Sequence, residues 1–72
     1  GVLIGITLKE REGGSFKVAV RSNDPANASE ICAKLRGGGH KAAAGCSVKG
    51  DLESVKQKVL SVCKKYIGDH AL

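Results

Sequence analysis

Apolar and polar side chains alternate twice near the start of the chain, in "VLIGITLKE" and again in "FKVAVRS". Alternation with a period of two predicts a β-strand with one buried face, so strands are expected over residues 2–10 and 16–22. Gly13 and Gly14 lie between the two runs and favour a turn, which would join the strands into a β-hairpin. The predicted buried positions are Val2, Ile4, Ile6 and Leu8 in the first strand and Phe16, Val18 and Val20 in the second, whereas Lys17, Ala19 and Arg21 fall on the opposite face.

The apolar period changes to that of a helix after Pro25. Asn27 and Glu30 have the spacing of a capping box, with Asn27 in place of the usual Ser or Thr. Gly37 then stands where the C-terminus of a helix favours a residue of positive φ. The predicted buried face of this helix consists of Ala28, Ile31, Cys32 and Leu35.

The second half of the chain predicts one short strand and one long helix. The strand is "CSVK", and Asp51 can cap a helix that runs to Tyr66. Its predicted buried stripe is Leu52, Val55, Val59, Val62 or Cys63, and Tyr66. The order of hairpin, helix, glycine loop, strand and helix predicts a single α+β domain over residues 1–72, with a small mixed β-sheet (the N-terminal hairpin plus a further strand) and two helices packed on it.

Composition narrows the class of protein. The 72 residues carry a net charge of +5, which favours anionic partners such as phosphates or nucleic acid. No apolar run approaches the roughly 20 residues of a membrane span, and the start of the chain lacks the basic leader of a signal peptide. Cys32, Cys46 and Cys63 fit neither a zinc site nor a redox pair, so we expect three buried free thiols in a cytoplasmic protein.

The stretch "LRGGGHKAAAGC" is a candidate anion site. Glycines let backbone N–H groups approach a phosphate without steric cost, and His40 and Lys41 add donors beside them. The alanines at 42–44 favour a helix, whose N-terminus would add further N–H groups. The alternative is that Gly37 ends the preceding helix and that Gly38 and Gly39 are only a loose connector.

Arg21 and Ser22, in "RSND", form a second candidate at the end of a predicted strand. An arginine can hold a phosphate through two parallel hydrogen bonds. The alternative is a surface arginine beside the turn that Asp24 and Pro25 favour.

Together, "FKVAVRSND", "LRGGGHKAAAGCSVKG" and the closing helix resemble the DHH-associated domain (type one). This is the C-terminal, substrate-binding domain of the Asp-His-His (DHH) phosphoesterases. The resemblance extends from about Leu3 to Ile67, which suggests a domain cut from a longer phosphoesterase. Its most specific part is the run from Gly37 to His40, followed by Ala43, Ala44 and Gly45.

The resemblance implies binding of a phosphoester substrate. Family members hydrolyse short oligonucleotides, single-stranded DNA, cyclic dinucleotides or 3′-phosphoadenosine 5′-phosphate, and a separate N-terminal domain holds the metal, usually manganese. Carried over to this sequence, the phosphate contacts would be the glycine loop (Gly37, Gly38 and Gly39), His40 and Arg21, with Ser22 and Lys41 as secondary candidates. The expected partners are short RNA, single-stranded nucleic acid or a phosphorylated nucleotide, together with the catalytic DHH domain.

A hydrolytic metal centre needs several converging carboxylates and imidazoles. The aspartates and histidines of this sequence are scattered, and "GDHAL" lacks a second His and is interpreted as a tail. We therefore expect no catalytic residue, metal ligand or cofactor in this chain, and manganese in the missing domain.

The parent protein remains open at this point. An oligoribonuclease that also acts as a 3′-phosphoadenosine 5′-phosphate phosphatase is the leading hypothesis, while an exonuclease or a cyclic-dinucleotide phosphodiesterase also fits. The main alternative is a non-catalytic nucleic-acid-binding module similar to the C-terminal domain of alanyl-tRNA synthetase, whose glycine stretch tends to lack the arrangement that includes His40. A small basic domain used only for assembly is a third reading.

Overall fold

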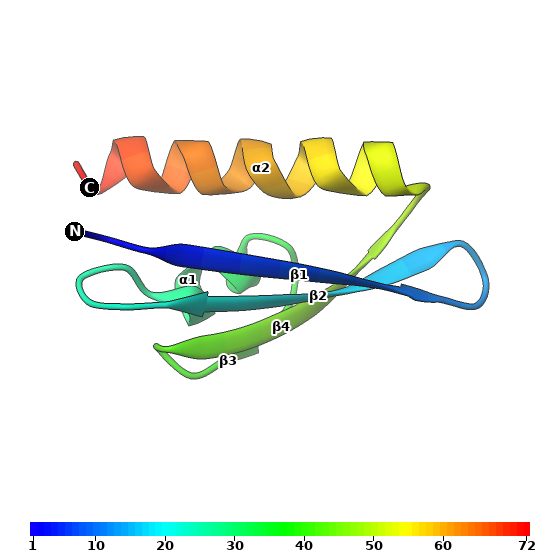
Figure 1. Ribbon diagram of the computed structural model, residues 1–72, viewed down its shortest axis with the longest axis horizontal. Coiled ribbons are helices and arrows are strands. Elements are labelled where there is room, and N and C mark those ends of the chain that lie inside the picture. The colour runs from blue at the N-terminus through cyan, green and yellow to red at the C-terminus, as the bar shows by residue number, and fades with distance from the viewer.

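A computed structural model describes all residues of the chain, from Gly1 to Leu72. Its elements are β1 (Ile4–Arg11), β2 (Ser15–Ser22), α1 (Ala28–Ala33), β3 (Gly38–Gly39), β4 (Ala43–Lys49) and α2 (Leu52–Asp69) (Figure 1). The predicted α+β class is confirmed. The N-terminal hairpin forms as predicted, with both turn glycines at positive φ.

The sheet has four strands in the order β1-β2-β4-β3. Every neighbouring pair is antiparallel, so the sheet is not mixed, and β3 adds a strand to the three that the sequence predicted. The expected strand at residues 46–49 begins earlier, at Ala43. The expected strand at residues 2–10 is shifted to Ile4–Arg11.

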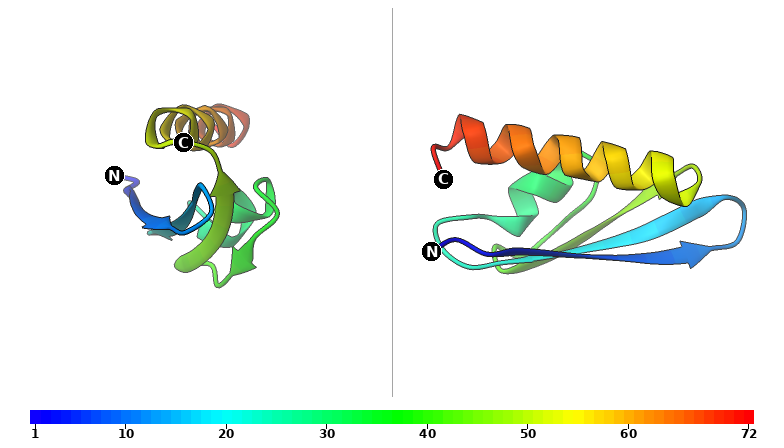
Figure 2. Two further views of the ribbon diagram at one scale, coloured as in Figure 1. Left: turned by 90° about the vertical axis from the view of Figure 1, so that its right-hand side faces the viewer. Right: turned by 45° about the horizontal axis from the view of Figure 1, so that its top comes forward.

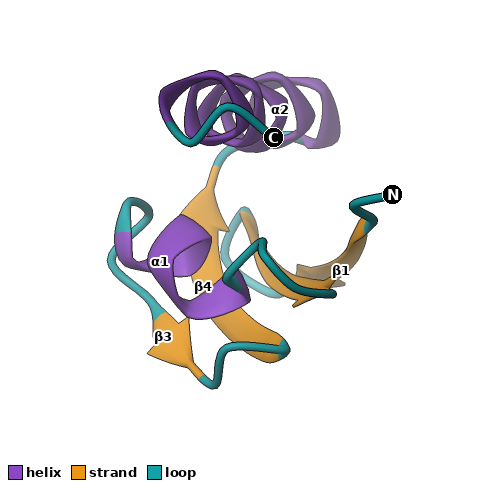
Figure 3. Cartoon of the chain, turned by 90° about the vertical axis from the view of Figure 1, so that its left-hand side faces the viewer, coloured by secondary structure: helices purple, strands orange, loops and turns teal.

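Both helices cover the same face of the sheet. Figures 2 and 3 show the sheet curving around α1, with α2 lying across the same side. The opposite face carries no helix and is open to solvent. The buried core lies between the layers and consists of Phe16, Val18, Val20, Ala26, Ala28, Ile31, Cys32, Leu35, Cys46, Val48, Val55, Val59, Cys63 and Tyr66.

The end of α1 differs from the expectation at one residue. Arg36, not Gly37, has the positive φ, at 63°. The N–H of Gly37 donates to the carbonyl of Cys32 and the N–H of Arg36 donates to that of Ala33, at 2.8 and 3.1 Å. This is the bond pattern of a Schellman motif, which needs its left-handed residue one position before Gly37.

The start of α2 confirms the predicted cap, because the N–H of Ser54 donates to the Asp51 carboxylate at 2.8 Å. Leu52 was expected in the buried stripe but is 55% exposed. The helix also extends past Tyr66 to Asp69. "GDHAL" is therefore partly helical, and the His70 ring stacks on Tyr66.

Candidate phosphate-binding site

The glycine stretch is neither a slack loop nor the approach to a helix. Gly38 and Gly39 form an edge strand that pairs with Gly45 and Ala44 of β4. The helix that the alanines at 42–44 would favour does not form, because Ala43 and Ala44 belong to β4 and pair with β2. Helix propensity is a weak preference that strand pairing overrides, and no helix N-terminus lies at this site.

A cross-strand row brings His40 and Arg21 onto one face. Arg21 pairs with Ala43. His40 lies opposite Ala43 as well, because its N–H donates to the Ala43 carbonyl at 2.8 Å and its carbonyl accepts from the Ala43 N–H at 3.2 Å. Residues of one row direct their side chains to the same face of the sheet, so the side chains of Arg21 and His40 lie on either side of the small Ala43. Two strand spacings separate their backbones, or roughly 9–10 Å.

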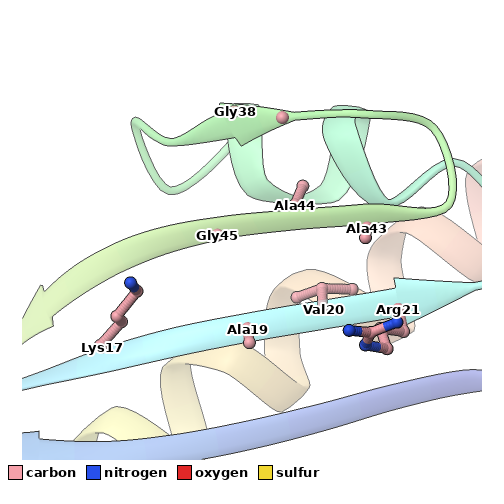
Figure 4. A pocket seen from close by; sticks show the side chains of 9 residues that line it. Lys17, Ala19, Val20, Arg21, Gly38, Ala43, Ala44 and Gly45 are labelled. Atoms are coloured by element: carbon pink, nitrogen blue, oxygen red, sulfur yellow. The ribbon is translucent and has the colours of Figure 1, made fainter.

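The open face of the sheet beside Arg21 has a hollow with small residues at its base and the cationic side chains of Lys17 and Arg21 at its sides. A hollow of about 380 Å³ is lined by Lys17, Ala19, Val20, Arg21, Gly38, Gly39, Ala43, Ala44 and Gly45. Figure 4 shows it with the helices behind the sheet, so the hollow opens on the face without helices. Lys17 and Arg21 come from β2, four positions apart on the face opposite the buried Val18 and Val20. The arrangement is an open, positively charged surface suited to a phosphate group.

The three glycines differ in what they do. Gly37 lies against β4, where an added Cβ would be 2.2 Å from the Gly45 carbonyl oxygen. Gly38 has open space above it. Gly39 has a φ of 152° and directs its N–H off the edge of the sheet, because its neighbour His40 uses its own N–H in the ladder with Ala43. Gly37 thus allows close backbone packing against β4, Gly38 leaves space above the sheet, and Gly39 presents an unpaired N–H at its edge.

Four of the predicted site residues do not line this hollow: Gly37, His40, Ser22 and Lys41. His40 is exposed beside it, whereas Ser22 and Lys41 make other contacts. The Ser22 hydroxyl donates to the carbonyls of Ala26 and Lys41, at 3.3 and 3.1 Å, and so ties the turn after β2 to the β3–β4 hairpin. The Lys41 ammonium pairs with Asp24, and the hydrogen bond to that carboxylate raises the pKa of Lys41 above its usual value. Both side chains are thus engaged in local structure.

Comparisons with known proteins identify the family of this chain. The sequence profile of the DHHA1 domain matches residues 1–69. This chain belongs to the DHHA1 domain family. A Thermus thermophilus protein named "Bifunctional oligoribonuclease and PAP phosphatase NrnA" is 39% identical over 66 residues, which cover 90% of this chain and 20% of that protein. The chain therefore spans about a fifth of the relative's length, and the match associates this DHHA1 domain with the DHH-family phosphoesterases.

Lys17 was not among the candidates from the sequence, although it lines the hollow of this DHHA1 domain. The alternation in "FKVAVRS" already placed it on the same face as Arg21. The sequence did not show that β4 pairs with β2. The residues of β4 that line the hollow are small, so they leave the side chains of Lys17 and Arg21 uncovered.

The DHHA1 domain holds no group of three or more His, Cys, Asp or Glu side chains that could bind a metal ion. Neither of its helices is long and apolar enough to cross a membrane.

Proposed function

We propose that this DHHA1 domain binds the phosphate groups of a phosphoester substrate, a short oligoribonucleotide or 3′-phosphoadenosine 5′-phosphate, for a DHH-family phosphoesterase. The observation that carries the proposal is the row in which Arg21 and His40 flank Ala43 on the open face. The name of the Thermus relative supports this class of substrate.

Each side chain has a distinct role in the proposal. Arg21 holds two phosphate oxygens through parallel N–H donors, and the His40 ring donates from the other side. Lys17 adds charge at the far end of the hollow. Gly38 leaves room for the phosphate to approach the sheet. The flat floor over Ala19 and Gly45 leaves space for the attached sugar or base.

Catalysis belongs outside this chain in the proposal. The scattered carboxylates and imidazoles do not fit a hydrolytic metal centre. We propose that a separate DHH domain of the parent protein, located in the cytoplasm, holds manganese and faces the open surface of the sheet. The 72-residue chain with Mn²⁺ should then leave a short RNA and 3′-phosphoadenosine 5′-phosphate intact, and turnover that co-purifies with this chain would contradict the assignment.

The binding role is tested by NMR titration of the 72-residue chain with 3′-phosphoadenosine 5′-phosphate. We expect the amides around Arg21, Ala43 and His40 to shift together. Replacement of Arg21 by Gln removes the bidentate contact, which is worth about 1.5–3 kcal/mol and weakens binding roughly tenfold or more. His40→Ala should have a smaller effect in the same direction.

Arg11→Gln is the matched control, because it removes the same charge at the far end of β1. If Arg11→Gln weakens binding as much as Arg21→Gln, the interaction is only net charge and the proposed site is wrong. Thermal melts of all variants show whether a loss of binding reflects a loss of folding.

A further inference from the structure

A second and larger cationic hollow lies at the other end of β4. It has a volume of about 620 Å³ and is lined by Lys34, Leu35, Arg36, Cys46, Ser47, Val48, Lys49 and Lys58. Its four cations come from three segments: Lys34 and Arg36 from the turn that follows α1, Lys49 from β4 and Lys58 from α2. No acidic side chain lines the hollow, and none of the four cations takes part in a salt bridge.

The edge of β4 also offers backbone donors to this hollow. β3 pairs only with Gly45 and Ala44, so β4 has no neighbour on that side beyond Gly45. Alternate residues of β4 face β3, as the bonds between Ala43 and His40 show, and the same alternation points the N–H groups of Ser47 and Lys49 off the sheet edge. Neither N–H donates to a backbone group outside the sheet or to a side chain. Free N–H donors and unpaired cations together are what an anion needs.

The two hollows meet at β4: the first opens on the face without helices, and the second lies at the edge of β4, beside α2 and the turn after α1. Lys17, which lines the first, pairs directly with Ser47, which lines the second. Such cross-strand partners have Cβ atoms about 4.5–5.5 Å apart. Three to five residues along β4 separate Ala44 from Ser47 and Lys49, or roughly 10–17 Å. One phosphate cannot occupy both hollows, whereas the backbone of a short oligonucleotide can extend from one to the other.

We propose that the second hollow is a further phosphate subsite, which holds a backbone phosphate of an oligonucleotide whose end phosphate lies between Arg21 and His40. Lys49 and Lys58 neutralise the charge, and the Ser47 and Lys49 N–H groups donate to the phosphate oxygens. The subsite rests on the proposed function, because it takes the same substrate. It makes the domain select for length: a mononucleotide fills only the first hollow, and a longer chain gains contacts in the second.

The test compares two probes on the 72-residue chain, 3′-phosphoadenosine 5′-phosphate and a 5′-phosphorylated adenosine pentaribonucleotide. The double variant Lys49→Gln/Lys58→Gln should weaken pentanucleotide binding about four- to twenty-five-fold, because each exposed charge contact contributes a factor of about two to five. The slope of log affinity against log salt should become shallower by about 1.4. Binding of the bisphosphate should stay within about twofold of the original value. The amides of Ser47 and Lys49 should shift with the pentanucleotide and not with the bisphosphate.

The control is Lys56→Gln/Lys64→Gln, which removes the same charge from exposed positions of α2 that line neither hollow. The subsite is wrong if this control weakens the pentanucleotide equally, or if the Lys49/Lys58 variant binds it normally. Arg21→Gln separates the two proposals, because it should weaken both probes. If Arg21→Gln has no effect while the Lys49/Lys58 variant does, the second hollow is supported and the proposed function of the first is contradicted.

Discussion

At the scale of single residues, the neighbouring glycines Gly37 and Gly38 have different structural roles. A Cβ at Gly37 would lie 2.2 Å from the Gly45 carbonyl oxygen and 2.4 Å from the Cys46 Cβ, so the backbones of the α1–β3 connection and β4 could not approach each other. A Cβ at Gly38 meets nothing within 4 Å. Gly37 is therefore required by packing, and Gly38 is free to serve a ligand.

These two positions give a matched pair of variants. Gly37→Ala should destabilise the fold by about 3 kcal/mol, at the upper end of overpacking costs, because the colliding atoms include backbone. Gly38→Ala should leave the midpoint of guanidinium unfolding nearly unchanged. Because its methyl group enters the proposed phosphate hollow, the variant should bind 3′-phosphoadenosine 5′-phosphate more weakly. Equal stability of the two variants would contradict the packing role of Gly37, and unchanged nucleotide binding by Gly38→Ala would contradict the place of Gly38 in the site.

At the scale of elements, a partly buried hydrogen bond joins α2 to the start of α1. The Asn27 N–H donates to the Tyr66 hydroxyl at 3.0 Å, and Tyr66 is 1% exposed. Asn27 also caps α1 by accepting from the Glu30 N–H at 3.2 Å. Only this half of the predicted capping box forms, because the Asn27 N–H is directed to α2 and not to the Glu30 side chain.

Tyr66→Phe keeps the buried ring and removes this one acceptor. We expect a loss of stability of about 1–2 kcal/mol, because the Asn27 N–H loses its partner in a partly buried place. Chemical denaturation measures the loss, and phosphate binding on the far side of the sheet should be unaffected. A stability equal to that of the original chain would mean that water replaces the hydroxyl at no cost.

The sequence predicted those elements whose signals are local. The alternation of β2 and the Asp51 cap of α2 each follow from a few neighbouring residues, and both are confirmed. The alanines at 42–44 misled the prediction, because their strand state depends on β2, some twenty positions away. The site shares this limit: the chemistry of Arg21 and His40 and the family resemblance made them candidates, but their common row with Ala43 exists only through strand pairing. Their role in binding phosphate stays a prediction.

At the scale of the whole molecule, the three cysteines report on the integrity of the core. Cys32, Cys46 and Cys63 come from α1, β4 and α2, and all are free and buried. Burial, with a contribution from the neighbouring Cys46, raises the pKa of the Cys32 thiol to about 11. Burial also raises the pKa of Cys46 and of Cys63. The thiols are thus neutral and shielded in the folded chain, and a thiol reagent at pH 8 should react with them only as fast as the molecule opens.

The raised pKa of Cys32 also sets the direction of an alkaline effect on stability. In the unfolded chain this thiol ionises near its ordinary pKa of 9.0, whereas in the folded chain it keeps its proton until about pH 11. Between these values the unfolded state binds fewer protons, so the free energy of unfolding falls as pH rises, while below pH 9 the thiol contributes no pH dependence. Guanidinium unfolding at pH 7.5, 9 and 10.5 measures this slope. Cys32→Ala should lower stability at every pH by leaving a small cavity, yet make the decline above pH 9 shallower than in the original chain. Parallel pH profiles for the two proteins would show that the Cys32 thiol ionises as easily in the folded core as in the unfolded chain.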